Sequence, residues 1–194
     1  AAWENKKLEV DIMHDFCYVS KKEAALVRAN LLNIIHEVQD IVRNDFTFKF
    51  NFIGSSSRNM ITYDRKSNIG FDFDVNIEVN DDDGNFSPKE IRTKIRKALD
   101  NVARKYDYDY CEDSTRVLTI KVKDRTKSKI IHSCDFAIVY NCENGSQKYI
   151  RYNKSNRTYT WEYQGNGFET LPAKIAWLKA NGYWENLKNY YIDK

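Results

Sequence analysis

The stretch from Phe71 to Val79 alternates strictly between apolar and polar residues. Apolar side chains stand at positions 71, 73, 75, 77 and 79, and Asp72, Asp74, Asn76 and Glu78 stand between them. A period of two predicts a β-strand with one buried face. On such a strand, the side chains of Asp72 and Asp74 project from the polar face at points roughly 6.5–7 Å apart. Carboxylates so spaced could share two divalent cations ~3.5–4 Å apart, as two-metal phosphoryl chemistry requires. The simpler interpretation of a lone Asp-x-Asp is a solvated strand face.

Composition limits the class of protein. The chain has 194 residues, of which 42% are hydrophobic and 30% charged. This favours one soluble globular domain, and no apolar run reaches the ~18 residues of a membrane-spanning helix. No secretory signal is recognised at the start of the given sequence. A formal net charge of +3 is too small to indicate nucleic-acid binding by itself.

The cysteines and histidines do not form a recognisable ligand set. No C-x-x-C pair occurs, which favours reduced thiols in a cytoplasmic protein. A catalytic metal would therefore be bound by oxygen ligands, which indicates Mg²⁺ or Mn²⁺ rather than zinc. The residues concerned are Cys17, Cys111, Cys134, Cys142, His14, His36 and His132.

Helix and strand patterns occur in both halves of the chain. Helices are predicted from Ser20 to about Asn44, from Ser87 to about Lys105 and from Thr170 to about Asn181, and a last aromatic segment follows at 183–191. Strands are predicted at 46–53, 71–79, 117–122 and 130–140, and a hairpin at 148–163. The sequence therefore predicts an α+β protein with a mixed β-sheet flanked by helices.

A polar turn follows the first of these strands. It reads Gly54-Ser55-Ser56-Ser57-Arg58 and offers backbone N–H groups, hydroxyls and a guanidinium. These groups suit phosphate oxygens. Taken alone, the turn could equally be an ordinary flexible loop.

A third carboxylate stands within a predicted central strand. Asp135 is surrounded by the apolar run from Ile130 to Tyr140. A carboxylate there is costly unless it is paired, hydrogen-bonded or bound to a metal. Asp135 is therefore the most informative residue outside the opening strand.

Two basic segments could contact a nucleic acid or simply keep the protein soluble. One is the hairpin from Lys148 to Arg157, and the other is the predicted outer face of the second helix. That helix face comprises Lys89, Arg92, Lys94, Arg96, Lys97, Arg104 and Lys105.

The order of these features resembles the DNA polymerase β-like nucleotidyltransferase superfamily. Its signature is an apolar residue with Gly and Gly or Ser, then Asp-apolar-Asp/Glu, then a downstream acidic residue. Ile53-Gly54-Ser55, Phe71 to Val75 and Cys134-Asp135-Phe136 fit this signature. The resemblance covers roughly residues 45–140 and implies the palm fold of that superfamily.

The resemblance also implies roles for individual residues. Asp72 and Asp74 would hold two Mg²⁺ or Mn²⁺ ions, and Asp135 would complete the acceptor-side site. Gly54 and Ser55 would contact the β- and γ-phosphates of a nucleoside triphosphate, with three further phosphate neighbours. Those neighbours are Ser56, Ser57 and Arg58.

Two departures from the superfamily pattern concern substrate selection. The gap between Ser55 and Asp72 is longer than is usual, so it could be an insertion that shapes the nucleotide or acceptor site. A helical domain that covers the nucleotide base in many members would be absent, small or cut off. We therefore expect a catalytic domain with an N-terminal helix at 1–169 and a C-terminal helical segment at 170–194.

The leading hypothesis is a metal-dependent nucleotidyltransferase that moves a nucleoside monophosphate from an NTP such as ATP to a hydroxyl and releases pyrophosphate. The acceptor could be an RNA end, a nucleotide, a small molecule or a protein side chain, and no membrane partner is expected. One alternative is an inactive module of the same fold that binds nucleotide or RNA. Another is a structural module in which the aspartates are incidental.

Overall fold

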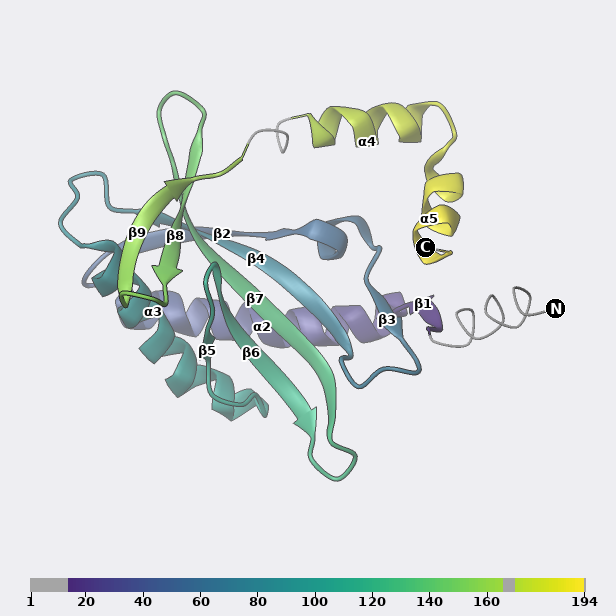
Figure 1. Cartoon of the computed structure of the whole chain (residues 1–194), viewed down its shortest axis with the longest axis horizontal. Coiled ribbons are helices and arrows are strands. Elements are labelled where there is room, and N and C mark those ends of the chain that lie inside the picture. The colour runs from purple at the N-terminus through teal and green to yellow at the C-terminus, as the bar shows by residue number, and fades with distance from the viewer. Residues whose placement is uncertain (1–13, 166–169, 194) are drawn as a thin grey trace.

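The computed structural model describes residues 14–165 and 170–193, and Figure 1 shows their arrangement. The helices are α2 (Lys21–Val42), α3 (Pro88–Ala103), α4 (Leu171–Ala180) and α5 (Trp184–Ile192). Two short 3₁₀ segments are η1 (Gly54–Arg58) and η2 (Arg104–Tyr106). The strands are β1 (Phe16–Tyr18), β2 (Thr47–Ile53), β3 (Thr62–Asp64), β4 (Phe71–Asn80), β5 (Glu112–Asp113), β6 (Val117–Asp124), β7 (Lys129–Asn141), β8 (Gln147–Asn153) and β9 (Thr158–Tyr163).

A seven-stranded mixed sheet forms the centre of the described structure. Its order is β2-β4-β7-β6-β5, with β8 beside the end of β7 and β9 beside β8. Only β4 and β7 run parallel, and the other pairs are antiparallel. The predicted α+β fold with a mixed sheet and flanking helices is confirmed.

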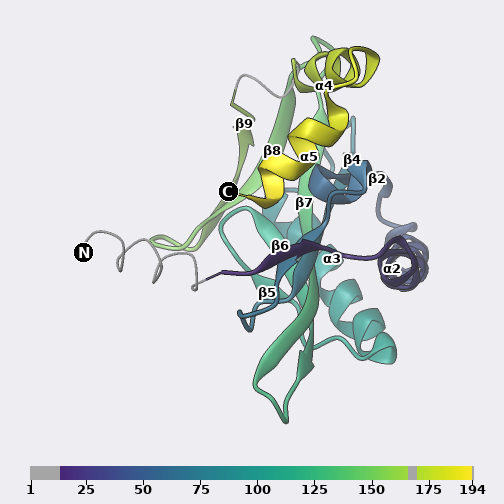
Figure 2. The same cartoon turned by 90° about the vertical axis from the view of Figure 1, so that its right-hand side faces the viewer.

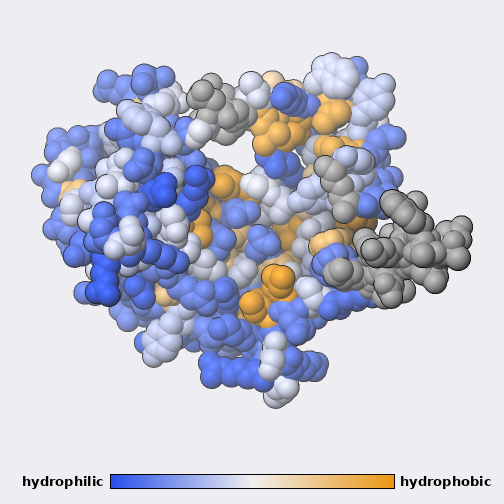
Figure 3. Space-filling model, viewed as in Figure 1, coloured by the Kyte–Doolittle hydropathy of each residue, from blue (hydrophilic) through white to orange (hydrophobic). Residues whose placement is uncertain are grey.

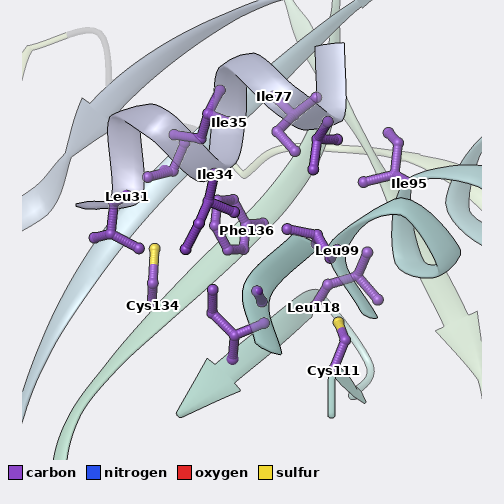
Figure 4. Close-up of a cluster of buried hydrophobic side chains, with 14 of the residues drawn as sticks. Leu31, Ile34, Ile35, Ile77, Ile95, Leu99, Cys111, Leu118, Cys134 and Phe136 are labelled. Carbon is purple, nitrogen blue, oxygen red and sulfur yellow. The ribbon is translucent and has the colours of Figure 1, made fainter. Parts of the chain in front are cut away.

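Helices α2 and α3 cover one face of this sheet, as Figure 2 shows from the side. Ser20 caps α2 by accepting a hydrogen bond from the N–H of Glu23, and Ser87 and Glu90 form a capping box at α3. Apolar side chains of both helices pack on β4, β6 and β7 (Figure 4). The opposite face of the sheet is not covered by these two helices, so polar groups on β4 and β7 can reach solvent.

One part of the predicted basic helix face is wrong, because Arg92 is buried with only 1% of its surface exposed. Its guanidinium pairs with Asp113 at 2.7 Å and donates to the carbonyls of Ser114, Val117 and Ile150. The Asp113 carboxylate balances the positive charge of Arg92, and together with the three carbonyls it accepts hydrogen bonds from the guanidinium N–H groups. Arg92 therefore ties α3 to β5, β6 and β8, rather than offering a surface contact.

The long gap between Ser55 and Asp72 contains β3. This strand pairs with β1 in a separate two-stranded sheet, in the register Phe16 to Asp64. The pairing is three residues long and lies between segments far apart in the sequence, which leaves no periodic signal.

The C-terminal helices form where the sequence predicts them. None of the residues of α4 is buried, and Trp177 remains 58% exposed. Helix α5 returns toward β1, where the Tyr18 hydroxyl donates to the carbonyl of Lys188 at 2.5 Å. The division into 1–169 and 170–194 stays a prediction, and it falls partly on residues outside the described ranges.

Two further expectations concern thiols and membranes. All four cysteines lie within the described residues, and each is a free thiol, as expected for reduced cysteines. Among residues 14–165 and 170–193, no helix has the length and apolar character needed to span a bilayer.

Candidate active site

The strand β4 presents its acidic residues exactly opposite its buried face, as its alternation predicts. Phe71, Phe73 and Val75 are buried under the helices, while Asp72 is exposed and Asp74 half-buried. The alternation follows from the pleat of the strand, which sends successive side chains to opposite faces. Asp72 and Asp74 therefore stand on the open face of the sheet.

Asp135 stands beside Asp74 on that same open face. The two residues are Cα partners in the parallel pairing of β4 with β7, and Asp72 pairs with Ser133 one step back. Partners in a parallel pair lie on neighbouring strands ~4.8 Å apart. The sequence-predicted carboxylates are therefore neighbours on two central strands.

Thr119 on β6 satisfies one oxygen of Asp135. Its hydroxyl donates to Oδ1 of Asp135 at 2.5 Å, and Thr119 is itself 9% exposed. The sequence reasoning missed this residue, because only the register of β6 on β7 brings the two side chains together. A hydroxyl on one carboxylate oxygen fixes the rotamer and leaves the other oxygen for a ligand.

The electrostatics of the carboxylates show that they repel one another. Burial, followed by the charges of Asp72 and Asp135, raises the pKa of Asp74 to about 6. Burial and the charge of Asp135 also raise the pKa of Asp72. Because neighbouring like charges add to burial in raising both pKa values, a cation bound beside these carboxylates would be stabilising.

The turn after β2 packs against this cluster. Gly54 has a φ of +62°, and a Cβ built there would lie 2.6 Å from Oδ2 of Asp74. No other residue type fits without displacing the carboxylate. The turn at Gly54 therefore lies directly against the carboxylate strand.

The serines of this turn have different environments. Ser56 is buried and its hydroxyl donates to the carbonyl of Ile53, while the hydroxyl of Ser57 donates to the carbonyl of Gly54. Both bonds stabilise the short 3₁₀ turn. Ser55 and Arg58, at either end of this set, are half-buried.

The possible metal ligands lie farther apart than they would around a bound metal ion. Among the described residues, no group of three or more His, Cys, Asp or Glu side chains is gathered closely enough to hold a metal ion. His132 does not take part, because it lies against Tyr108, and burial lowers its pKa to about 4. The donor set that remains on the open face consists of carboxylate oxygens.

The fold of this chain is similar to that of other proteins of known structure. No protein-family model matches the sequence, and no curated protein sequence matches it. Solved structures do match the chain, and two of them with TM-scores above 0.5 illustrate the likeness. One is the CD-NTase CdnG of Bradyrhizobium diazoefficiens in complex with GTP, with a TM-score of 0.56 and 12% identity, covering 76% of this chain and 40% of that one. The other is DncV of Vibrio cholerae in its 3′-deoxy GTP bound form, with a TM-score of 0.51 and 9% identity, covering 80% of this chain and 54% of that one.

The chain therefore spans about half the length or less of these two proteins. At these identities the likeness concerns the fold alone. The matches confirm the predicted resemblance at the level of the fold, and the roles expected of individual residues stay predictions. The chain has the α+β nucleotidyltransferase fold seen in the CD-NTase CdnG.

Proposed function

We propose that this protein transfers a nucleoside monophosphate from an NTP to a hydroxyl acceptor, with release of pyrophosphate. The observation that carries the proposal is the juxtaposition of Asp74 with Asp135 across the parallel β4–β7 pair, with Asp72 on the same face. The close approach of Gly54 to Asp74 adds a turn suited to a triphosphate. The likeness of fold to nucleotidyltransferases supports the same reaction class.

The residues on the open face fit Mg²⁺ or Mn²⁺ by the chemistry of their donors. Carboxylate oxygens suit these hard cations, and Asp72, Asp74 and Asp135 would hold them. Bound cations would lower the pKa of the acceptor hydroxyl and offset charge on the transferred phosphoryl group. The repulsion from Asp72 and Asp135, which adds to burial in raising the pKa of Asp74, would then be relieved.

The neighbouring residues would position the substrate. Ser55 offers a hydroxyl and Arg58 a guanidinium at the turn beside Asp74, and both would bind phosphate oxygens. Gly54 keeps the space next to Asp74 free of a side chain. Ser57 lies on the exposed side of the turn, and Ser56 would support the turn from within.

A thermal-shift panel tests this proposal. Each of four NTPs is added with Mg²⁺ or Mn²⁺ to the wild type, to Asp74→Asn and to Asp82→Asn. Asp82 is an exposed carboxylate in the turn after β4, so its variant removes the same charge away from the site. We expect one or more NTPs to stabilise the wild type and Asp82→Asn by several degrees, and Asp74→Asn to lose this shift. GTP is the first NTP to test, because CdnG was solved with it.

Incubation with α-labelled NTP, metal and candidate acceptors tests catalysis itself. A labelled acceptor product that requires Asp74 supports the proposed transfer. The loose arrangement of the carboxylates favours one alternative, a module that binds nucleotide without catalysis. Binding without any labelled product would assign the protein to that alternative, and a wild type with neither binding nor product would refute both.

A further inference from the structure

We propose that one end of the β8–β9 hairpin binds the phosphate backbone of a nucleic acid. The surface consists of four exposed cations, which we call the hairpin patch: Arg116, Arg151, Lys154 and Arg157. This inference does not depend on the proposed nucleotide transfer.

The hairpin holds an excess of positive charge. From Gln147 to Tyr163 the chain carries four cations, which are Lys148 and the patch residues Arg151, Lys154 and Arg157. The same segment has one acid, Glu162, so the excess is three. The whole chain has 31 cations and 28 acids, which is the same excess. The hairpin is therefore a locally basic segment, although the overall charge alone does not indicate nucleic-acid binding.

The cations of the hairpin patch are not neutralised by acidic neighbours. Within the described part of the chain, none of them forms an ion pair, and Arg116 lies over the ring of Tyr149 at 4.9 Å. Some exposed cations elsewhere are paired, such as Lys105 with Glu37 at 2.7 Å and Arg125 with Asp109 at 2.9 Å. An unpaired cation can bind a phosphate without first breaking an ion pair.

The position of the patch makes it accessible. Figure 2 shows β8 and β9 curving away from α2 and α3, so that their connecting turn stands on the opposite side of the sheet. This is the side on which the carboxylates of β4 and β7 are exposed. Figure 3, viewed from that side, shows a largely hydrophilic surface over β8 and β9.

The hairpin is also held in shape before any ligand binds. Tyr152 and Tyr159 stack with ring centroids 4.6 Å apart, and the Tyr159 hydroxyl donates to Asp113 at 2.8 Å. The N–H of Tyr152 donates to the carbonyl of Thr115, beside Arg116. A preformed ribbon loses little conformational entropy on binding.

Nucleic acid fits this surface better than a membrane does. No large apolar side chain from 151 to 160 is among the exposed ones, so the tip offers nothing to insert into lipid. Around the cations stand neutral hydrogen-bonding groups that suit phosphate and sugar oxygens. They are Asn153, Ser155, Asn156 and Thr160.

Fluorescence anisotropy with labelled 12-nucleotide single-stranded RNA, single-stranded DNA and duplexes tests the inference, at 50–200 mM salt. The test variant is Arg151→Ala/Lys154→Ala/Arg157→Ala. The control is Lys105→Ala/Arg125→Ala/Lys127→Ala, which removes three exposed cations that are ion-paired. Both have the same net charge, and circular dichroism checks that both are folded.

We expect the wild type and the control to bind at least one of these nucleic acids with similar affinity. The hairpin variant should bind at least tenfold more weakly, with a salt slope smaller by about 2–3, since each lost phosphate contact removes about 1. Equal losses in both variants, or no binding by the wild type at 50 mM salt, would overturn the inference. Polyglutamate competing as well as RNA would assign the patch to acidic proteins instead.

The same samples separate this inference from the proposed function. The hairpin variant should keep the thermal shift given by NTP and Mn²⁺, because its substitutions lie on β8 and the turn after it and leave β4 and β7 unchanged. Loss of RNA binding with an intact NTP shift supports the patch. An NTP shift absent from the wild type refutes the nucleotide site without affecting the nucleic-acid result.

Discussion

Replacing Gly54 by alanine tests whether this glycine keeps space for Asp74. The best control is Gly84→Ala, because Gly84 has a φ of +63° against +62° at Gly54, but no atom lies within 4 Å of its built Cβ. At Gly54 the same Cβ would lie 2.6 Å from Oδ2 of Asp74. The two substitutions therefore share the backbone effect and differ in the contact with the carboxylate.

The expected losses of stability follow from the backbone effect and from the contact with the carboxylate. The left-handed conformation costs an alanine roughly 1–2 kcal/mol at either position. Each kcal/mol lowers the Tm of a chain of this size by about 2–4 °C. Asp74 must also turn away to bring the Cβ contact from 2.6 Å to at least 3.4 Å. Turning it off its rotamer costs about 0.5–1.5 kcal/mol more, and only in Gly54→Ala.

Urea unfolding measures the stability of both variants, and thermal shift with NTP and Mn²⁺ measures the site. Gly84→Ala should keep the ligand-induced shift of the wild type, and Gly54→Ala should lose it. Adding Asp74→Ala to Gly54→Ala should remove the extra instability, because the crowded carboxylate is gone. Equal stabilities and equal ligand shifts in the two single variants would refute the role assigned to Gly54.

Three further predictions concern the carboxylates and the core. Asp74→Asn should stabilise the metal-free protein by about 1 kcal/mol at pH 7.5 and by nearly nothing at pH 4, as measured by urea unfolding. The pKa of Asp74 is raised to about 6 in the folded state, so between about pH 4 and 6 the folded state keeps a proton that the unfolded state releases, and the stability of the protein falls as pH rises through this range. The full effect of such a pKa shift is ~3 kcal/mol, and solvent screening reduces it. Arg92→Met removes the close cationic partner of the buried Asp113 carboxylate and leaves it the more distant Arg96, at 3.8 Å, so it should cost about 3–5 kcal/mol. Arg96→Met changes a half-exposed side chain and should cost at most about 1 kcal/mol; similar losses in the two variants would contradict this. Thr119→Val should weaken Mn²⁺ binding, measured by calorimetry, because Asp135 loses its hydroxyl donor, whereas Thr119→Ser should retain the affinity. Equal Mn²⁺ affinities in the two variants would contradict a positioning role for Thr119.

Much of the site could be predicted from the sequence because strand geometry is local. A period of two places Asp72 and Asp74 on one face whatever the partner strands are. The glycine and serines after a strand likewise indicate a turn. The sheet and its flanking helices followed from the same local periodicities.

The remaining features depend on contacts between distant segments. The burial of Arg92 requires carbonyls from β6 and β8 to meet α3, and the helix pattern alone does not distinguish it from its exposed basic neighbours. The bond from Thr119 to Asp135 depends on the register of β6 on β7. The pairing of β1 with β3 joins two three-residue strands, too short for a periodic signal.

Anomalous diffraction from crystals of this protein soaked with Mn²⁺ and a non-hydrolysable NTP tests the central claim most directly. The account predicts anomalous peaks on the open face of the sheet, within coordination distance of Asp72, Asp74 and Asp135, with the triphosphate beside Gly54. Ordered nucleotide elsewhere, or a soaked crystal with no manganese peak at these three carboxylates, would contradict it.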